Sequence, residues 1–314
     1  DSTIVEGTRE KNVAVLTYKN TTDFYSFTSL QAAIDKAKGD ANANAVRLIK
    51  DVEATKVIEI SDNVTIDGNG KTISTSDNRI VRITKSNAKV TISNVNFVSS
   101  AVMNYPSDVR GVSIDAYLSN VELTLNNCSI DFTDETTNDW TYAVNVSGNG
   151  TGHKVTVNGG TYEGANVINV HGANNTINVK NTTLTSLYPN NDVYYGACIW
   201  VLEKQNSSVY AEGSTFNGNI AIAFNLGTGT AREEKNNTDN TTLFVANCLY
   251  KDTNKAYVVT NAEGLATLNA KMANGTAGKG IVVNINADID FTGKTWTQVD
   301  SHVDFGCYIS ELNG

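Results

Sequence analysis

The chain contains few of the residues that interrupt a β-sheet or cross-link a fold. Its 314 residues include two prolines, Pro106 and Pro189, and four cysteines without a C-x-x-C pair. Proline removes a backbone donor from a sheet, so its scarcity permits long runs of strand. The cysteines have no metal-ligand spacing to the three histidines, so we expect buried free thiols, no metal site and no cofactor.

Charge is also scarce, and basic clusters are missing. Charged residues make up 18% of the chain, and 33 acidic against 24 basic residues give a net charge of −9. Nucleic acids and anionic membranes attract clustered Lys and Arg, so this composition argues against nucleic-acid partners. The chain has no run of about 18 apolar residues, so we expect no membrane insertion.

The chain is rich in Asn, Thr, Gly and Val. These residues occur in a repeated sequence pattern. Six segments align without a gap, the last of them degraded, and each holds an alternating strand, a polar corner and a second short strand. The six segments are Val90–Phe97, Leu123–Ile130, Val155–Tyr162, Ile177–Leu184, Val209–Phe216 and Leu243–Tyr250. Asn lies at the corner in four of them, at positions 94, 127, 181 and 247, because Asn tolerates the left-handed backbone.

A further short strand precedes each segment. These strands begin at residues 81, 112, 144, 168, 199 and 222, and therefore step by 31, 32, 24, 31 and 23 residues. A base period near 23, with insertions of about eight residues, predicts three strands per coil and coils stacked along one axis. The predicted fold is all-β, a right-handed parallel β-helix. The alternative is a β-sandwich of short strands.

Both ends of the predicted stack contain helical patterns. Apolar residues recur at helical spacing within about 26–38, which predicts a helix that caps the N-terminal end of the stack. We therefore assign residues 1–260 to one β-helical domain that includes an N-terminal strand and this helix. Residues 261–314 repeat the helix-then-strand order, and they form either a C-terminal cap or the start of a second β-helical module.

The chain resembles the pectate-lyase-like β-helix superfamily, and within it the uncharacterised, adhesin-like cell-surface proteins of gut bacteria. The residues that carry the resemblance are the helix Ser29–Asp35, the segment Leu48–Asp51 and the Gly-rich entry coil Ile66–Gly70. The resemblance, together with a first residue other than Met, implies a bacterial protein that is secreted or displayed at the cell surface. It implies no activity, because this fold hosts lyases, hydrolases, adhesins and phage tailspikes.

The family's catalytic motif sets are missing from this sequence. It has no Asp-Asp, Gly-His-Gly or Arg-Ile-Lys motif of the polygalacturonase-like hydrolases, whose Asn-Thr-Asp occurs only by itself at 237–239, and no Arg-x-Pro-x-x-Arg of the best-known pectate lyases. These two reactions are therefore disfavoured, whereas a more divergent lyase or hydrolase is not.

Three long connections leave the same corner of the predicted stack, at about 99–111, 131–143 and 185–198. Loops on a rigid scaffold commonly bind ligands, and a short connection at 163–167 predicts a notch between two of them. We expect Asn145 and Asn169 to form its floor, because flat rings and amides suit sugars. The aromatic residues expected at its edge are Trp140, Tyr142, Tyr194, Tyr195 and Trp200. The alternative is an ordinary solvated surface.

Catalytic candidates are weak. His171 and Asp115 occupy one outward column of the predicted stack, two coils and about 10 Å apart, and Arg82 lies one coil further. Our first hypothesis is a non-catalytic, adhesin-like surface module whose partner is a polysaccharide or a host or cell-surface glycan. The alternative is a divergent polysaccharide lyase or glycoside hydrolase acting in the same notch, and a tailspike-like protein ranks third.

Overall fold

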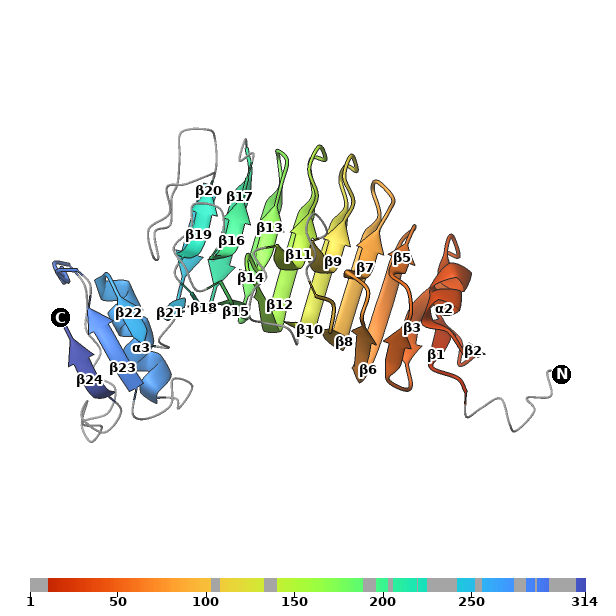
Figure 1. Cartoon of the computed structure of the whole chain (residues 1–314), viewed down its shortest axis with the longest axis horizontal. Coiled ribbons are helices and arrows are strands. Elements are labelled where there is room, and N and C mark those ends of the chain that lie inside the picture. Colours follow the sequence, from red (N-terminus) through yellow and green to blue (C-terminus); the bar gives the residue numbers. More distant parts are fainter. Residues whose placement is uncertain are drawn as a thin grey trace.

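The described part of the chain consists mostly of β-strands that pair in parallel, with two α-helices. The structure is a computed structural model that describes residues 11–102, 108–132, 140–188, 196–202, 206–218, 220–224, 242–251, 256–273, 281–285, 287–293 and 309–314. Parallel strands follow one another along most of its length, and the two termini lie at opposite ends of the molecule (Figure 1).

The strands of the main body form three ladders, within which each strand pairs with its equivalent in the next repeat. The first ladder contains β3 (Ala43–Leu48), β6 (Val64–Thr75), β8 (Lys89–Ser99), β10 (Glu122–Phe132), β12 (Lys154–Gly164), β14 (Thr176–Lys180), β17 (Ser208–Glu212) and β20 (Thr242–Ala246). The second contains β4 (Val52–Ala54), the later halves of β6, β8, β10 and β12, and then β15 (Thr183–Ser186), β18 (Thr215–Asn217) and β21 (Leu249–Lys251). The third contains β5 (Ile58–Ile60), β7 (Arg79–Ile83), β9 (Val109–Ile114), β11 (Thr141–Val146), β13 (Ile168–Val170), β16 (Ala197–Val201) and β19 (Ile220–Phe224).

The chain visits the three ladders in order and then returns to the first; we call one such passage a layer. The register confirms the gap-free alignment of the repeat, since Val90 pairs with Leu123, Leu123 with Val155, and Val155 with Ile177. The predicted steps between third-ladder strands are confirmed by the pairing of Val112 with Val144. Inward side chains from all three ladders form one apolar core.

The corner between the first and second ladders has a left-handed backbone in the layers from β6 to β20. The predicted corner residues Asn94, Asn127, Asn181 and Asn247 have φ values of 56°, 49°, 50° and 54°, which confirms this role. Gly159 occupies the corner in one layer, and a Cβ there would lie 2.4 Å from the Oδ1 atom of Asn127. A second column of left-handed residues lies where each layer returns to the first ladder, at Asn87, Asn120, Gly152, Asn174 and Asn206.

The predicted N-terminal helix is confirmed as α2 (Leu30–Ala37), which begins after the N-cap Ser29 and buries Leu30, Ala33, Ile34 and Ala37. Its Gln31 side chain covers the open edge of β5. The Gln31 Nε2 atom donates to the Glu59 carbonyl at 2.9 Å, and the Glu59 N–H donates to Gln31 Oε1 at 2.9 Å. The amide therefore replaces the backbone of a missing neighbouring strand. Two further strands, β1 (Ala14–Tyr18) and β2 (Phe24–Phe27), extend the sheet beside β3.

Residues beyond Lys251 form a small unit that is joined to β21, because β22 (Tyr257–Val259) pairs antiparallel with β21 at Lys251–Tyr257 and Leu249 lies in the unit's apolar cluster. Its elements are β22, α3 (Ala262–Ala273), β23 (Ile281–Ile285) and β24 (Ile309–Asn313), and the three strands pair in parallel. The helix α3 buries Leu268 and Met272 in a cluster with Tyr257 and Val283, apart from the main core. The order strand, helix, strand in this unit is the order of β2, α2 and β3 at the N-terminal end. As Ser29 caps α2, Asn261 caps α3, because its Oδ1 atom accepts from the N–H of Gly264 at 2.8 Å.

Candidate functional site

The outward face of the third ladder brings together most of the residues selected from the sequence. Its register aligns Glu59, Arg82, Ser113, Asn145, Asn169 and Trp200 in one column. A neighbouring column follows the ends of the strands, because the N–H of Asp115 donates to Ile83, that of Ser147 to Ile114 and that of His171 to Val146. Asp115 and His171 are therefore two layers apart, or about 10 Å.

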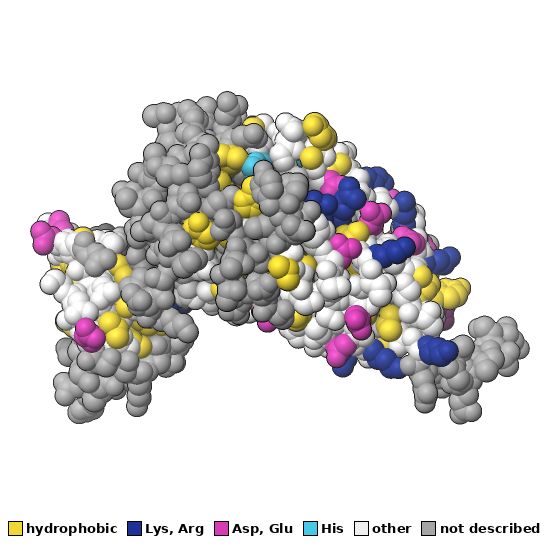
Figure 2. Space-filling view, viewed as in Figure 1, with side chains coloured by type: hydrophobic (Ala, Val, Ile, Leu, Met, Phe, Trp, Pro, Cys, Tyr) yellow, Lys and Arg dark blue, Asp and Glu magenta, His cyan; other side chains and the backbone are white. Residues whose placement is uncertain are grey.

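Arg82 is engaged by two carboxylates. Its Nε atom lies 2.8 and 2.7 Å from the two oxygens of Asp115, its Nη2 atom lies 2.6 Å from the same carboxylate, and its Nη1 atom lies 3.3 Å from Glu59. The hydrogen bonds to Asp115 raise the pKa of Arg82, so the guanidinium stays charged. Figure 2 shows basic and acidic side chains interleaved over this end of the molecule. Arg82 and Asp115 are therefore held together as an ion pair.

A second charged group consists of Arg79, Asp108 and Arg110. None of the three was predicted as a site residue. Asp108 accepts from the Nε and Nη2 atoms of Arg110, and it lies 3.7 Å from Arg79 Nη2. Burial and the neighbouring Arg110 charge lower the pKa of Arg79, and its buried Nε atom has no partner. In the sequence, Arg and acidic residues alternate around the third-ladder strands, and this pattern could have indicated a charged group. Which arginine pairs with which carboxylate depends on the strand register.

A row of polar side chains continues from Arg110 along the ladder. Arg110 Nη1 donates to Ser147 Oγ at 2.9 Å, Asn145 Nδ2 donates to the same oxygen at 3.0 Å, and Asn169 Nδ2 donates to Asn145 Oδ1 at 2.7 Å. Asn145 and Asn169 are each 2% exposed, and Asn169 Oδ1 has no hydrogen-bond partner. Ser147 is buried as well.

The open notch expected over these residues is not seen among the described parts of the chain. Trp200 is 7% exposed and packs outside the main core in a small cluster with Ala197, Ile220 and Ala223. Tyr142 is also buried, and Trp140 is half-buried. Tyr194 and Tyr195 lie outside the described residues. The alternation of apolar and polar residues correctly predicted which side chains of these strands point away from the core. It did not predict that these outward side chains are buried.

His171 is half-buried and lies two layers from the Arg82–Asp115 pair. A glycosidase needs two carboxyl groups about 5 to 9.5 Å apart, one of them free to exchange a proton. The described carboxylates of this face, Glu59, Asp108 and Asp115, are all ion-paired to arginines. In the part of the chain that the structure describes, no group of three or more His, Cys, Asp or Glu side chains is arranged to hold a metal ion.

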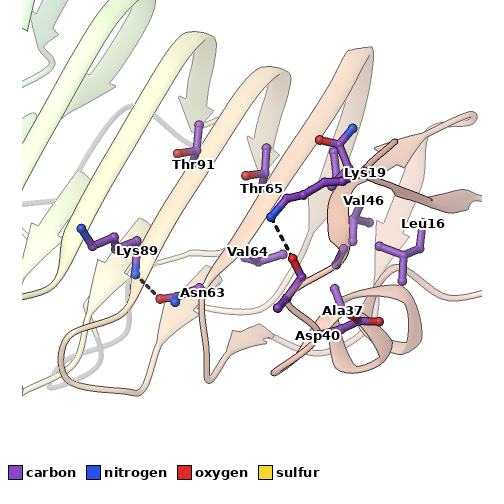
Figure 3. A pocket seen from close by; sticks show the side chains of 14 residues that line it. Leu16, Lys19, Ala37, Asp40, Val46, Asn63, Val64, Thr65, Lys89 and Thr91 are labelled. Atoms are coloured by element: carbon purple, nitrogen blue, oxygen red, sulfur yellow. Dashed lines mark hydrogen bonds between the residues drawn. The ribbon is translucent and has the colours of Figure 1, made fainter. Parts of the chain in front are cut away.

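A pocket of about 350 Å³ lies at the start of the first ladder (Figure 3). Its walls are Lys19, Asp40, Asn44 and Asn63 with the hydroxyls of Thr65 and Thr91, and its floor is apolar. Lys19 Nζ donates to the Ala41 carbonyl at 2.9 Å across the mouth. The pocket exists because β3 and β6 pair only at Val46–Ile66 and Arg47–Asp67, so their earlier residues separate.

Thr65 and Thr91 begin an accessible column on the outward side of the first ladder. We call this the first-ladder column; its members are Thr65, Thr91, Thr124, Thr156, Asn178, Tyr210 and Phe244, paired in this order. All seven are exposed or half-buried, and Tyr210 and Phe244 are 40% and 54% exposed. The alternation of apolar and polar residues predicts these outward positions as well as those of the third ladder.

Comparison with models of known families, with curated proteins and with solved structures finds no match to the chain. The resemblance to the pectate-lyase-like superfamily therefore stays a prediction. Neither of the described helices is long and apolar enough to cross a bilayer.

Proposed function

We propose that the chain is a right-handed parallel β-helix with three strands per coil, closed at its N-terminal end by α2. The support is the order in which the chain visits its three ladders, each strand pairing in parallel with its equivalent in the next layer. Connections between parallel strands of one sheet are almost always right-handed, which supplies the hand.

On this scaffold we propose a non-catalytic, adhesin-like module of a secreted or cell-surface protein that binds glycans. The observation that carries the proposal is the first-ladder column, seven accessible side chains that offer hydroxyls, an amide and aromatic rings at the spacing of adjacent strands. These are the groups that recognise sugars, which present hydroxyls at their rims and C–H groups on their faces. The ion-paired state of Arg82 and Asp115 supports a binding role over a catalytic one.

Two measurements test this function on the whole chain. A glycan array reports binding, and incubation with uronate and neutral polymers reports turnover through ultraviolet absorbance and new reducing ends. We expect binding without turnover. Turnover by the wild type that disappears in His171→Ala contradicts the non-catalytic function and favours the lyase alternative, whereas an array without any bound glycan contradicts glycan binding.

A further inference from the structure

The first-ladder column also indicates which glycans bind and where; this inference rests on the proposed glycan-binding function. We propose that the column is a linear binding track for a neutral polysaccharide with flat apolar ring faces, such as a β-linked glucan, which stacks on Tyr210 and Phe244. The track is distinct from the buried amide row of the third ladder.

The track is continuous, because parallel pairing keeps the column in register through seven strands. Six strand spacings give it a length of about 29 Å. The hydroxyls of Thr65, Thr91, Thr124 and Thr156 make no hydrogen bond to the described part of the chain, so they are available to a ligand. The pocket beside Lys19 and Asn44 lies at the start of the same track.

The two aromatic residues form the opposite end. Tyr210 and Phe244 are directly paired on β17 and β20, and both side chains point away from the core, which their neighbours Val209 and Leu243 enter. Large apolar side chains exposed singly are ordinary. Here two aromatic side chains are aligned at the end of a column of hydroxyl and amide groups, and together they form a surface on which a sugar ring can stack. The adjacent Asn178 can bond the hydroxyls of that sugar.

The charges beside the track select a neutral polymer. Three ion pairs flank it, Arg47–Asp67 at 3.5 Å, Lys89–Glu122 at 3.0 Å and Lys180–Glu212 at 2.7 Å. The next outward column also contains linked neutral groups, since Asn126 Nδ2 donates to Ser93 and Asn158 Nδ2 donates to Asn126. Each cation of these three pairs has its own carboxylate, so the pairs offer no excess charge to a uronate or sulfated chain. Lys154, which follows Glu122 in the same column, and Lys19 at the pocket lie outside these pairs.

The test measures binding of cellobiose, cellohexaose and oligogalacturonate by calorimetry to the wild type and to three variants of the whole chain. Tyr210→Ser/Phe244→Ser removes both rings, and Thr91→Val/Thr124→Val removes two hydroxyls without changing shape. Phe24→Ser/Tyr25→Ser is the matched control, because those aromatic side chains are both 58% exposed but lie on β2.

We expect cellohexaose to bind more tightly than cellobiose, and oligogalacturonate to bind weakly. Loss of the two rings lowers the cellohexaose affinity at least about tenfold, loss of the two hydroxyls lowers it about threefold, and the control is unchanged. All substituted side chains are accessible, so circular dichroism should show folded variants.

Three results overturn the track. They are glycan binding that survives the Tyr210→Ser/Phe244→Ser change, a preference for oligogalacturonate, and self-association of the wild type that the same change abolishes. The first two leave the proposed glycan-binding function intact. The third identifies the rings as an interface between copies of the chain. A wild type that binds neither these probes nor any glycan on the array contradicts the track and the function together.

Discussion

The Nδ1 atom of His153 accepts a hydrogen bond from the backbone N–H of Val121, one layer earlier, at 3.2 Å. His153 is 1% exposed, and its own N–H donates to Asn175 Oδ1 of the next layer at 3.0 Å. The N–H of Asn175 in turn donates to Ser207 Oγ at 3.3 Å. A polar side chain in each layer therefore accepts the backbone donor of the previous one, and the imidazole must be neutral at Nδ1 to do so.

This arrangement makes stability depend on pH. Burial lowers the pKa of His153, so below the unfolded pKa near 6.5 the unfolded chain binds a proton that the folded chain does not. We expect the free energy of unfolding to fall as the pH falls from 7.5 to 5.5, by at most about 1.4 kcal/mol per pH unit. Urea unfolding at pH 7.5 and at pH 5.5 measures this difference in the free energy of unfolding.

His153→Asn is the matched variant, because Asn175 performs the same role one layer on. It should retain the fold and lose most of this pH dependence. An unchanged difference between pH 7.5 and pH 5.5 in the variant would assign the effect to other groups.

Gly160 is predicted to tolerate no side chain. Its φ is +90°, and a Cβ would lie 1.8 Å from the Cys128 carbonyl oxygen. The control is Gly70→Ala, at a φ of +73° with no atom within 4 Å, which should cost only the left-handed strain of about 1–2 kcal/mol. We expect Gly160→Ala to lower the thermal midpoint clearly further. Equal midpoints for the two variants would show that the corner relaxes around a methyl group.

Asn169→Asp tests the buried amide row. The change places a carboxylate at a buried position and removes the donor to Asn145, so we expect a loss of about 3 kcal/mol or more at pH 7. Burial should raise the pKa of the new carboxyl group, so the folded state binds the proton more tightly and stability recovers as the pH falls through that pKa. Asn178→Asp, on a half-buried position of the first ladder, should change little. Similar losses in the two variants would show that the row is hydrated.

The Arg82–Asp115 pair is predicted to contribute modestly. Its geometry is bidentate, but the Arg82 side chain is 36% exposed, so solvent and salt screen the charges. A double-mutant cycle with Arg82→Met and Asp115→Asn should give a coupling of about 1 kcal/mol that decreases as salt is added. A coupling that does not respond to salt would indicate a pair shielded from solvent.

The repeat was predictable because each layer places chemically similar residues at equivalent positions. Val90, Leu123 and Val155 occupy one inward column, and the pairing observed is the alignment read from the sequence. The four corner asparagines were predictable for the same reason. The second left-handed column was missed, although Asn87, Asn120, Asn174 and Asn206 each lie three residues before the first apolar residue of a strand.

The site was less predictable, because alternation reports which side of a strand faces the core and not what covers the other side. Asn145 and Asn169 alternate with core residues as surface residues do, yet both are buried. Trp200 was expected at an open edge, and it packs against Ile220 and Ala223, which belong to the next layer. Such packing depends on contacts between layers that no local pattern records.

The layer organisation also means that the molecule can change its length in whole steps. Residues 154–175 make one layer, and without them Leu123 would meet Ile177, Asn127 would meet Asn181, and the N–H of His153 would meet Ser207 in place of Asn175. Insertion or loss of a complete layer therefore preserves the core, the corners and the polar stack while it shifts everything beyond by about 4.8 Å. The distance between the two ends of the stack can therefore change in steps of one layer while the packing within each remaining layer is kept.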